Sequence, residues 1–531
     1  MPSPSDAEIQ PPQTFGAVIA EHARVRPEAS AIIFEGRRTS YAELDRRTNR
    51  VANALLAAGV GPGRRIAYLG KNSDAALELT LGAAKAGAVM TPIGWRLAGE
   101  EIAWIADDCD AAMLFVEAEF ADLVQGLAAR LPKVRGYVAT DNAVAGWASY
   151  AAWRDAAPDA TPAVQTTPDD VVLQIYTSGT TGRPKGAMLT HANGIGFRTI
   201  VNRLGAEWIA GAAGEISLLV MPFAHIAGVG QSMGTFFNGG TVVVHREFDA
   251  GAVLDAVEQH GLTRLFLVPS ALQIVLAHPK AATTDFSRLN YFFYGASPIP
   301  LELLRRAIEV LGCGFVQLYG MTETWGGIVA LGPEDHDPAA PRRMTSAGRA
   351  LPGVELRILG PDGEVLAPNT VGEVAVRGPS VMKGYWNRAK ETAEALSADG
   401  WLRTGDAALM DEDGYLFIQD RIKDMIISGG ENVYPAEVES AIYGCPGVAD
   451  VAVIGVPDAR WGEAVKAVVV SAPGATPDPA AVIAWARQRV AAFKAPKSVD
   501  FIDALPRNPS GKILRRQLRE PYWAGRTRQV N

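Results

Sequence analysis

The residues best suited to chemistry are concentrated between Tyr176 and Gly186, where the sequence is Tyr-Thr-Ser-Gly-Thr-Thr-Gly-Arg-Pro-Lys-Gly. Its three glycines let the backbone turn tightly. The N–H groups around such a turn form an anion-binding nest, and the hydroxyls and Lys185 add donors and a positive charge. The segment therefore predicts a phosphate-binding loop. The residues expected to line it are Thr177, Ser178, Gly179, Thr180, Thr181, Gly182 and Lys185.

Apolar segments flank this loop. Val171–Ile175 precedes it and predicts a strand, and Ala187–Leu189 follows it. A Walker loop is excluded, because that motif needs Ser or Thr directly after its lysine, and here Gly186 follows Lys185. A flexible Gly/Ser/Thr linker is the alternative, and the Pro-Lys pair and flanking apolar segments count against it.

Four further segments place an acid or a base beside a turn. A carboxylate near a phosphate needs a hard cation between them, so Glu323 is a candidate Mg²⁺ ligand. A buried carboxylate offers about four lone-pair sites, enough for both hydroxyls of a ribose, so Asp406 is a candidate ribose acceptor. Lys512, in a loop rich in Pro and Gly, can hold a point charge where negative charge develops. Taken singly, these segments also fit a helix-start acid, ordinary turns or a solvated lysine. The segments are Gln317–Thr324, Trp401–Asp406, Asp420–Pro435 and Pro506–Lys512.

All five segments, in this order, resemble the motifs of the adenylate-forming superfamily, which holds acyl-CoA synthetases, peptide-synthetase adenylation domains and luciferases. The resemblance covers essentially the whole chain, and it favours the acyl-CoA synthetase (AMP-dependent CoA ligase) branch. It implies that a carboxylate attacks the α-phosphate of Mg-ATP to give an acyl-adenylate and pyrophosphate. Coenzyme A thiolate would then displace AMP.

The resemblance also implies roles for single residues in catalysis. Thr322 would reach the α-phosphate, and Glu323 with Thr177 would hold Mg²⁺. Lys512 would bridge the substrate carboxylate and the α-phosphate. Lys423 would be the hinge about which a C-terminal domain rotates between the two steps.

Other residues are assigned to the nucleotide and to coenzyme A. Tyr319 would form the wall against adenine, Asp406 would accept the ribose hydroxyls, and Arg421 would contact the nucleotide. Gly429 and Gly430 would line the pantetheine channel after rotation. The remaining nucleotide-binding candidates are Gly295, Ala296, Ser297, Gln317 and Gly320.

The acyl pocket is expected between Ala227–Gly234 and Thr324–Ile328. Neither stretch contains an acid or an arginine, which favours an apolar carboxylate. Trp325 would limit the depth of the pocket. Tyr294 stands at the first position of a Tyr-Gly-Ala-Ser segment where the family commonly has glycine, and it would narrow the pocket. The substrate-contacting candidates are His225, Gly228, Met321 and Gly326, and His225 is equally well explained as a packed histidine.

Composition restricts the class of protein. The chain has 531 residues, 48% of them hydrophobic and 20% charged, with a net charge of −8. The acidic balance argues against a nucleic-acid partner. Three cysteines without a CxxC pair argue against a disulfide scaffold or zinc site. No signal peptide or apolar run of spanning length is found. We therefore expect a cytoplasmic protein, monomeric or homodimeric, with weak membrane-surface contact left open.

The pattern of elements predicts an α/β fold. Alternating helices and strands, such as Ser40–Ala58 before Arg65–Leu69, indicate parallel sheets covered by helices. Short strands from about residue 352 predict a small β-barrel-like part. We expect a large N-terminal adenylation domain over residues 1–420, a hinge over 421–424, and a small, mobile α+β C-terminal domain over 425–531.

The predicted function is that of an ATP-dependent acid–CoA ligase with ATP, Mg²⁺ and coenzyme A as cofactors. A medium- or long-chain fatty acid is the first choice of substrate. An aryl or alicyclic acid of the coumarate, benzoate or steroid side-chain type is the first alternative. A stand-alone adenylation enzyme that loads a carrier protein is the second.

Overall fold

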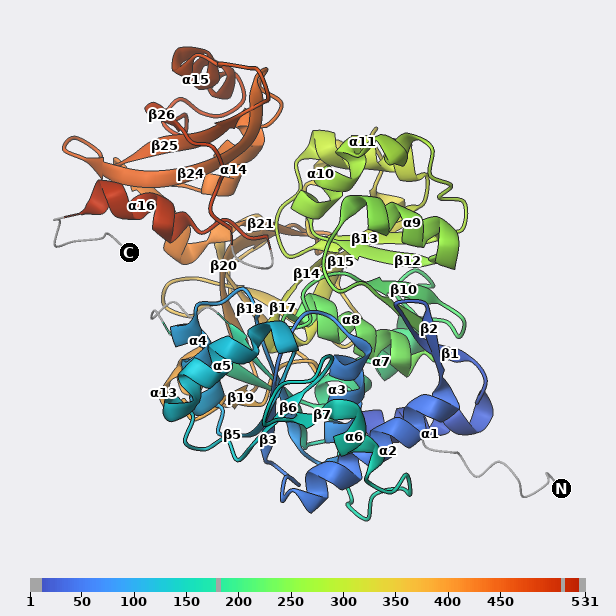
Figure 1. Cartoon of the computed structure of the whole chain (residues 1–531). Coiled ribbons are helices and arrows are strands. Elements are labelled where there is room, and N and C mark those ends of the chain that lie inside the picture. Colours follow the sequence, from blue (N-terminus) through green and yellow to red (C-terminus); the bar gives the residue numbers. More distant parts are fainter. Residues whose placement is uncertain (1–11, 178–182, 508–510, 525–531) are drawn as a thin grey trace.

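Two large sheets of mostly parallel strands form the lower and right-hand parts of the molecule in Figure 1. The computed structural model describes residues 12–177, 183–507 and 511–524. The nine-stranded sheet has the order β16-β15-β14-β13-β12-β10-β11-β1-β2, with antiparallel pairing only from β1 to β2, from β14 to β15 and from β15 to β16. Its strands are β1 (Ser30–Phe34), β2 (Arg37–Ser40), β10 (Ile216–Leu219), β11 (Thr241–Val244), β12 (Arg264–Leu267), β13 (Tyr291–Gly295), β14 (Gly314–Met321), β15 (Gly326–Leu331) and β16 (Arg349–Ala350).

The eight-stranded sheet has the order β19-β9-β8-β4-β3-β5-β6-β7, with antiparallel pairing only from β8 to β9 and from β9 to β19. It carries the strand predicted before the phosphate loop. Its strands are β3 (Arg65–Leu69), β4 (Val89–Ile93), β5 (Ala111–Val116), β6 (Gly136–Ala139), β7 (Ala148–Ser149), β8 (Val171–Thr177), β9 (Lys185–Thr190) and β19 (Gly384–Tyr385).

Helices cover these sheets, and their ends follow local sequence. The predicted helix from Ser40 begins with the Ser40 hydroxyl accepting the Glu43 N–H, and α3 ends at Gly87 in the left-handed conformation. The helices of this part are α1 (Phe15–Val25), α2 (Tyr41–Ala57), α3 (Asp74–Ala86), α4 (Gly99–Asp108), α5 (Ala121–Leu127), α6 (Tyr150–Asp155), α7 (His191–Leu204), α8 (Ile226–Phe237), α9 (Ala250–His260), α10 (Pro269–Ala277), α11 (Leu301–Leu311), α12 (Pro341–Met344) and α13 (Ala389–Ala395).

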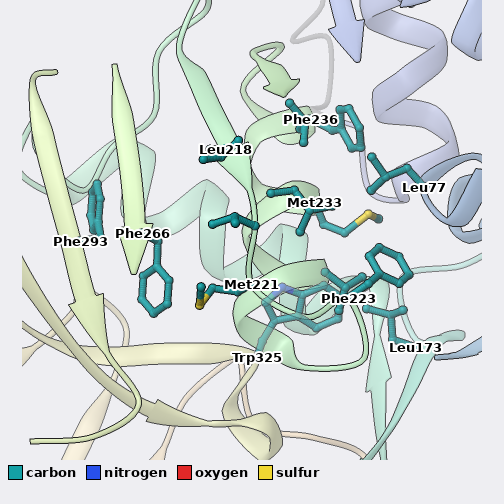
Figure 2. Close-up of a cluster of buried hydrophobic side chains, with 14 of the residues drawn as sticks. Leu77, Leu173, Leu218, Met221, Phe223, Met233, Phe236, Phe266, Phe293 and Trp325 are labelled. Atoms are coloured by element: carbon teal, nitrogen blue, oxygen red, sulfur yellow. The ribbon is translucent and has the colours of Figure 1, made fainter. Parts of the chain in front are cut away.

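One hydrophobic cluster joins the two large sheets through α8. Figure 2 shows Met233 and Phe236 of α8 between Leu77 and Leu173 on one side and Phe266 and Phe293 on the other. Phe236 and Met233 are fully buried. Burying side chains of this size contributes about 1.5–3 kcal/mol each, so α8 is held firmly between the sheets.

Two smaller sheets complete the fold. The predicted β-barrel-like part is a four-stranded antiparallel sheet in the order β17-β18-β20-β21. The C-terminal sheet has the order β23-β22-β25-β24, and β26 pairs with β25. Together with α14, α15 and α16 it forms the α+β fold expected for this part of the chain. The elements are β17 (Glu355–Leu359), β18 (Gly372–Arg377), β20 (Leu402–Met410), β21 (Leu416–Arg421), β22 (Ile426–Ser428), β23 (Glu431–Val433), α14 (Pro435–Ile442), β24 (Val448–Asp458), β25 (Gly462–Ser471), α15 (Pro479–Arg487), β26 (Ser498–Phe501) and α16 (Arg515–Trp523).

Across the described ranges, every helix is too short or too polar to cross a bilayer.

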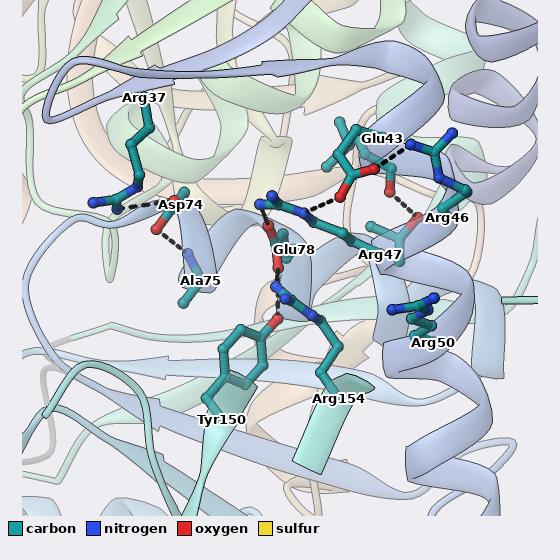
Figure 3. A network of polar contacts seen from close by, with 12 residues as sticks. Arg37, Glu43, Arg46, Arg47, Arg50, Asp74, Ala75, Glu78, Tyr150 and Arg154 are labelled. Carbon is teal, nitrogen blue, oxygen red and sulfur yellow. Dashed lines mark hydrogen bonds and ion pairs between the residues drawn. The ribbon is translucent and has the colours of Figure 1, made fainter. Parts of the chain in front are cut away.

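A buried carboxylate links α2, α3 and α6. Glu78 of α3 accepts hydrogen bonds from Arg47 at 3.0 Å, from Arg154 at 2.8 Å and from the Tyr150 hydroxyl at 3.0 Å, as Figure 3 shows. The Glu78 side chain is only 2% exposed. Because two arginines and a phenol all depend on this acid, it is a structural tie between helices far apart in the sequence.

We expect Glu78→Ala to lower the free energy of unfolding by about 3 kcal/mol, because it leaves Arg47 and Arg154 without their buried partner. Chemical denaturation followed by circular dichroism measures this. The control is Arg37→Ala, since the Arg37 side chain is 60% exposed and its pair with Asp74 is worth less than about 1 kcal/mol. Equal losses in the two variants would contradict the assignment of Glu78 as a structural tie.

Candidate functional site

The β8–β9 hairpin holds the base of the predicted phosphate loop. Its register pairs Thr177 with Lys185 and Tyr176 with Gly186, so both ends of the loop are fixed by the sheet. Ser178, Gly179, Thr180, Thr181 and Gly182 lie outside the described residues.

Asp108, at the end of α4, anchors this hairpin. The Tyr176 hydroxyl donates to one carboxylate oxygen at 2.7 Å, and Arg388 donates to the other at 2.6 Å. The Trp386 indole N–H donates to the Asp108 carbonyl at 3.0 Å, and the Trp386 backbone N–H to the Gly186 carbonyl at 2.8 Å. Sequence reasoning missed Asp108, Trp386 and Arg388, because they are far apart along the chain and no local motif marks them.

Glu323 lies at the same end of the hairpin. It belongs to the short 3-10 helix η4 (Thr322–Thr324) directly after β14, and it is 4% exposed. One of its carboxylate oxygens accepts a hydrogen bond from the Tyr385 hydroxyl at 2.8 Å and one from the Thr177 hydroxyl at 3.4 Å. The Lys185 ammonium lies 5.2 Å from the centre of the Tyr385 ring. The structure therefore brings the two predicted metal ligands together beside the predicted phosphate-binding lysine.

A second polar group gathers the predicted nucleotide-binding residues. Tyr319 on β14 donates its hydroxyl to Asp406 at 2.7 Å, and Arg421 pairs with the other Asp406 oxygen at 2.7 Å. Arg421 also donates to the Thr404 carbonyl at 3.3 Å. Asp406 and Arg421 face each other in the β20–β21 register. Burial raises the pKa of Tyr319, so its phenol stays protonated and donates.

Lys512 lies close to this group. Burial lowers the pKa of the Lys512 ammonium to about 8, with Arg421 lowering it further and Asp406 and Asp424 raising it. The preceding Gly511 has a φ of 82°, and a Cβ there would lie 2.8 Å from the Ser270 hydroxyl of α10. The loop that carries Lys512 thus packs against α10, with the lysine near Asp406 and Arg421, two of the predicted nucleotide-binding residues.

The end of β13 carries Gly295, followed by Ala296 and Ser297. A Cβ at Gly295 would lie 2.2 Å from the Leu318 carbonyl, so close approach of β13 and β14 requires glycine here. Ala296 has a left-handed φ of 67° and lines the cavity described next. Gln317, on the neighbouring strand, accepts a hydrogen bond from the Tyr294 hydroxyl at 3.2 Å.

Tyr294 does not narrow the acyl pocket, contrary to the expectation from sequence. It is fully buried, and its hydroxyl lies 2.9 Å from His336 Nε2, away from the cavity. His336 also lies 2.7 Å from the Gly332 carbonyl through Nδ1, and burial lowers its pKa to about 4. The Tyr294 hydroxyl instead forms a buried hydrogen bond with His336, which sequence reasoning did not identify.

A cavity of about 150 Å³ lies between α7, α8 and the nine-stranded sheet, next to the predicted nucleotide-binding residues. Of the four predicted substrate contacts, only Gly326 is among its lining residues. His225 is the N-cap residue of α8, and a Cβ at Gly228 would lie 2.4 Å from the Pro222 carbonyl. The roles of His225, Gly228 and Met321 stay predictions. Most of the lining is apolar: Phe197, Val201, Ile209, Ile226, Phe266, Phe293, Leu318, Trp325 and Leu351.

Charged residues also line this cavity, and the sequence analysis missed them. Arg198, Glu215 and Arg264 come from α7, from the residue before β10 and from β12, outside both stretches expected to form the pocket. Only the folded sheet brings them together, which explains why no motif marked them.

Comparison with known proteins now identifies the family. Residues 19–386 match the AMP-binding enzyme family, and residues 437–512 match the AMP-binding enzyme C-terminal domain. The chain belongs to the AMP-binding enzymes. A feruloyl-CoA synthase of Amycolatopsis sp is 45% identical over 512 residues, which cover 96% of this chain and 99% of that one. A fatty acid–[acyl-carrier-protein] ligase of Streptomyces coeruleorubidus is 43% identical over 98% of both chains.

Solved structures agree. The ATP-bound structure of MatB from Rhodopseudomonas palustris superimposes with a TM-score of 0.87 at 33% identity, covering 96% of this chain and 99% of that one. This AMP-binding enzyme is an acid–thiol ligase of the AMP-forming acyl-CoA synthetase type, which uses ATP and coenzyme A.

The described residues of the AMP-binding enzyme fit a magnesium nucleotide. Glu323 and Thr177 offer hard oxygen ligands side by side, and Mg²⁺ is commonly held by one or two protein oxygens together with phosphates and water. Each oxygen of Asp406 has one partner, Tyr319 or Arg421, which leaves further lone pairs of the carboxylate for ribose hydroxyls, and Tyr319 beside it supplies a flat apolar face.

The pKa of Lys512 predicts the pH dependence of the first step. If the charged ammonium is required, kcat/KM in ATP–pyrophosphate exchange, measured without coenzyme A, should be full below about pH 8 and fall as the pH rises through that value. With ATP bound, phosphate charge raises the pKa, so kcat should fall only at higher pH.

Lys512→Arg is the control, because its guanidinium stays charged throughout this range. In this variant kcat/KM should no longer fall near pH 8, although the altered geometry lowers the rate at every pH. If kcat/KM of Lys512→Arg still fell near pH 8, the titrating group would be a residue other than Lys512.

Proposed function

We propose that this enzyme activates a compact, ring-sized carboxylic acid with ATP and transfers the acyl group to coenzyme A. The observation that carries the choice of substrate is the cavity, whose volume is about 150 Å³. An engineered protein cavity of that size takes up benzene, so one ring fills it. An extended alkyl chain would need the cavity to lengthen.

The wall formed by Trp325 supports this proposal. Trp325 stacks on Phe15 of α1 with ring centres 5.6 Å apart and 12° between the planes. A Cβ at Gly194 of α7 would lie 2.7 Å from the indole, so no space remains behind the ring. Trp325 also has a left-handed φ of 56°, which costs free energy for a bulky residue and persists because the surroundings hold it. A wall fixed in this way limits the length of the acyl group.

In the first step, the substrate carboxylate oxygen bonds to the α-phosphorus, and the bond from that phosphorus to pyrophosphate breaks. Lys512, held near Asp406 and Arg421, would neutralise the charge of the two anions as they approach. Thr322, beside Glu323, would donate to the α-phosphate. A Mg²⁺ ion at Glu323 and Thr177 would supply charge neutralisation on the phosphates.

In the second step, coenzyme A thiolate bonds to the acyl carbon, and AMP leaves. We propose that the C-terminal part, residues 425–531, rotates about 421–424 before this step and withdraws Lys512. Lys423 lies in the short 3-10 helix η6 (Ile422–Asp424), directly between β21 and β22. Gly429 and Gly430 form the β22–β23 turn with φ of 63° and 86°, beside the 40% exposed Trp461. Such a turn can approach a pantetheine arm closely.

A panel of acids tests the proposal. The enzyme is incubated with Mg-ATP, coenzyme A and benzoate, cinnamate, octanoate or palmitate, and the products are identified by mass spectrometry. We expect kcat/KM for the best ring acid to exceed that for palmitate by at least about 10-fold, since overfilling a packed pocket costs about 1–3 kcal/mol. Acyl-adenylate without thioester would point to a carrier protein as acceptor.

A pair of variants separates pocket size from other causes. Trp325→Ala opens the cavity and should raise kcat/KM for palmitate relative to the ring acids. Trp147→Ala removes an indole that stacks on Tyr137 at the far edge of the eight-stranded sheet, and it should change no preference. Palmitate as the best substrate of the unaltered enzyme would overturn the proposed acyl class.

A further inference from the structure

Charged side chains gather at the inner end of the acyl cavity, whereas most of its wall is apolar. At the opposite, outer end, Ala296 and Gly320 line the cavity near the carboxyl ends of β13 and β14, where the proposed nucleotide-binding residues lie. Arg264 pairs in register with Tyr291, four residues before Gly295. At about 3.3 Å per residue, Arg264 is therefore about 13 Å deeper along the strands. Polar groups at this depth face the far end of a bound acyl group, away from the carboxylate that reacts.

Glu215 has its hydrogen bonds satisfied at this end. Its carboxylate is 3.3 Å from Arg264 Nε, accepts from the Asn238 amide at 3.3 Å and accepts from the Ala212 N–H at 3.3 Å. Arg264 is equally committed, because it donates to the Ala210 carbonyl at 2.6 Å and lies 5.5 Å from the centre of the Phe293 ring. The opposite charges of Glu215 and Arg264 therefore compensate each other, and their hydrogen bonds fix the loop before β10 to β12.

Arg198 is different. It projects from α7 into the same cavity, and within the described part of the chain its guanidinium makes no hydrogen bond or ion pair. Burial lowers the pKa of Arg198, and the nearby charges of Glu215 and Arg264 act on it in opposite directions. One positive charge with several free N–H donors is thus in excess at the inner end of an otherwise apolar pocket. A guanidinium in such a place gains most from an oxygen acceptor brought by a ligand.

Space for this side chain is provided by α8. A Cβ at Gly234 would lie 2.9 Å from Arg198 Nη2 and 3.2 Å from its Cζ, so a larger residue would displace the guanidinium. Nearby, the hydroxyls of Ser217 and Thr235 bond to each other at 2.8 Å. The helix facing Arg198 is therefore shaped to hold the guanidinium against the cavity.

We propose that Arg198 is a specificity residue that binds an oxygen acceptor at the end of the acyl group remote from the reacting carboxylate. The acceptor is an ether, a carbonyl or a second carboxylate. This inference rests on the proposed ligase function, and it narrows the substrate from any ring-sized acid to one with a distal oxygen.

Matched acids test the inference. Cinnamic acids with a para-ethyl, para-methoxy or para-carboxylate group differ little in shape but differ in acceptor and charge. In ATP–pyrophosphate exchange, we expect kcat/KM for the methoxy acid to exceed that for the ethyl acid by at least about 10-fold, because a charge-assisted hydrogen bond is made only with oxygen. A still higher value for the carboxylate would identify an anion as the preferred acceptor.

Arg198→Met, of similar length and without charge, should abolish the preference by lowering kcat/KM for the methoxy acid to the level of the ethyl acid. Gly234→Ala should weaken the preference by displacing the guanidinium while keeping its charge. The control is Arg203→Met, which removes an exposed arginine from the same helix and should keep the preference. Retention of the preference in Arg198→Met, or a wild-type preference for the ethyl acid, would overturn the inference.

Failure of the proposed acyl class would look different. No cinnamic acid would then be adenylated, whereas a fatty acid would be. The comparison of unaltered enzyme with Arg198→Met would then use fatty acids of equal length that end in methoxy or ethyl. The same loss of preference in the variant would support the role of Arg198, and equal use of both acids by the unaltered enzyme would refute it.

Discussion

The cost of burying a positive charge governs the site, because Lys512 sits where water is scarce. Burial lowers the pKa of its ammonium, Arg421 adds repulsion, and Asp406 and Asp424 raise the pKa. A lysine so placed is charged only while its acidic neighbours, or the phosphates of a nucleotide, remain close. The residue is therefore tied to the position of the loop from which it comes, and Gly511, packed against α10, fixes that loop.

The other polar groups of the site share neighbours in the same way. Asp406 pairs with Arg421 and accepts a hydrogen bond from Tyr319. One carboxylate therefore positions an aromatic wall and also stabilises the positive charges of Arg421 and Lys512. Glu323 is held by Tyr385 and Thr177, and Tyr385 in turn lies beneath Lys185. Because each group has more than one partner, the protein's own side chains hold this arrangement. Preorganised charges of this kind stabilise a transition state without rearranging during the reaction.

Sequence reasoning succeeded where chemistry is local. Ser40 and Gly87 bound their helices as capping rules predict. Residues of short motifs also meet in the fold, Thr177 with Glu323 and Tyr319 with Asp406 and Arg421, while their roles stay predictions. It failed where function depends on residues joined only by the fold. Asp108 reaches Arg388 across the sheet, and Tyr294 turns inward to His336. Arg198 enters the cavity from a helix that carries no motif. Side-chain direction at such positions depends on strand register and helix rotation, which composition does not fix.

The hydrophobic cluster around α8 has a consequence for how this enzyme can change over evolution. Phe266 and Phe293 belong both to the core that joins the two large sheets and to the wall of the acyl cavity. A substitution that enlarges the pocket at either position also removes packing that holds the sheets together, at about 3–5 kcal/mol for Phe→Ala. New acyl preferences should therefore arise more readily at Gly230, Gln231 and Gly234, on the cavity side of α8, than at the aromatic residues opposite. In this fold, the side of the cavity that can be remodelled at low cost is the helix, whereas changes on the sheet side also weaken the core.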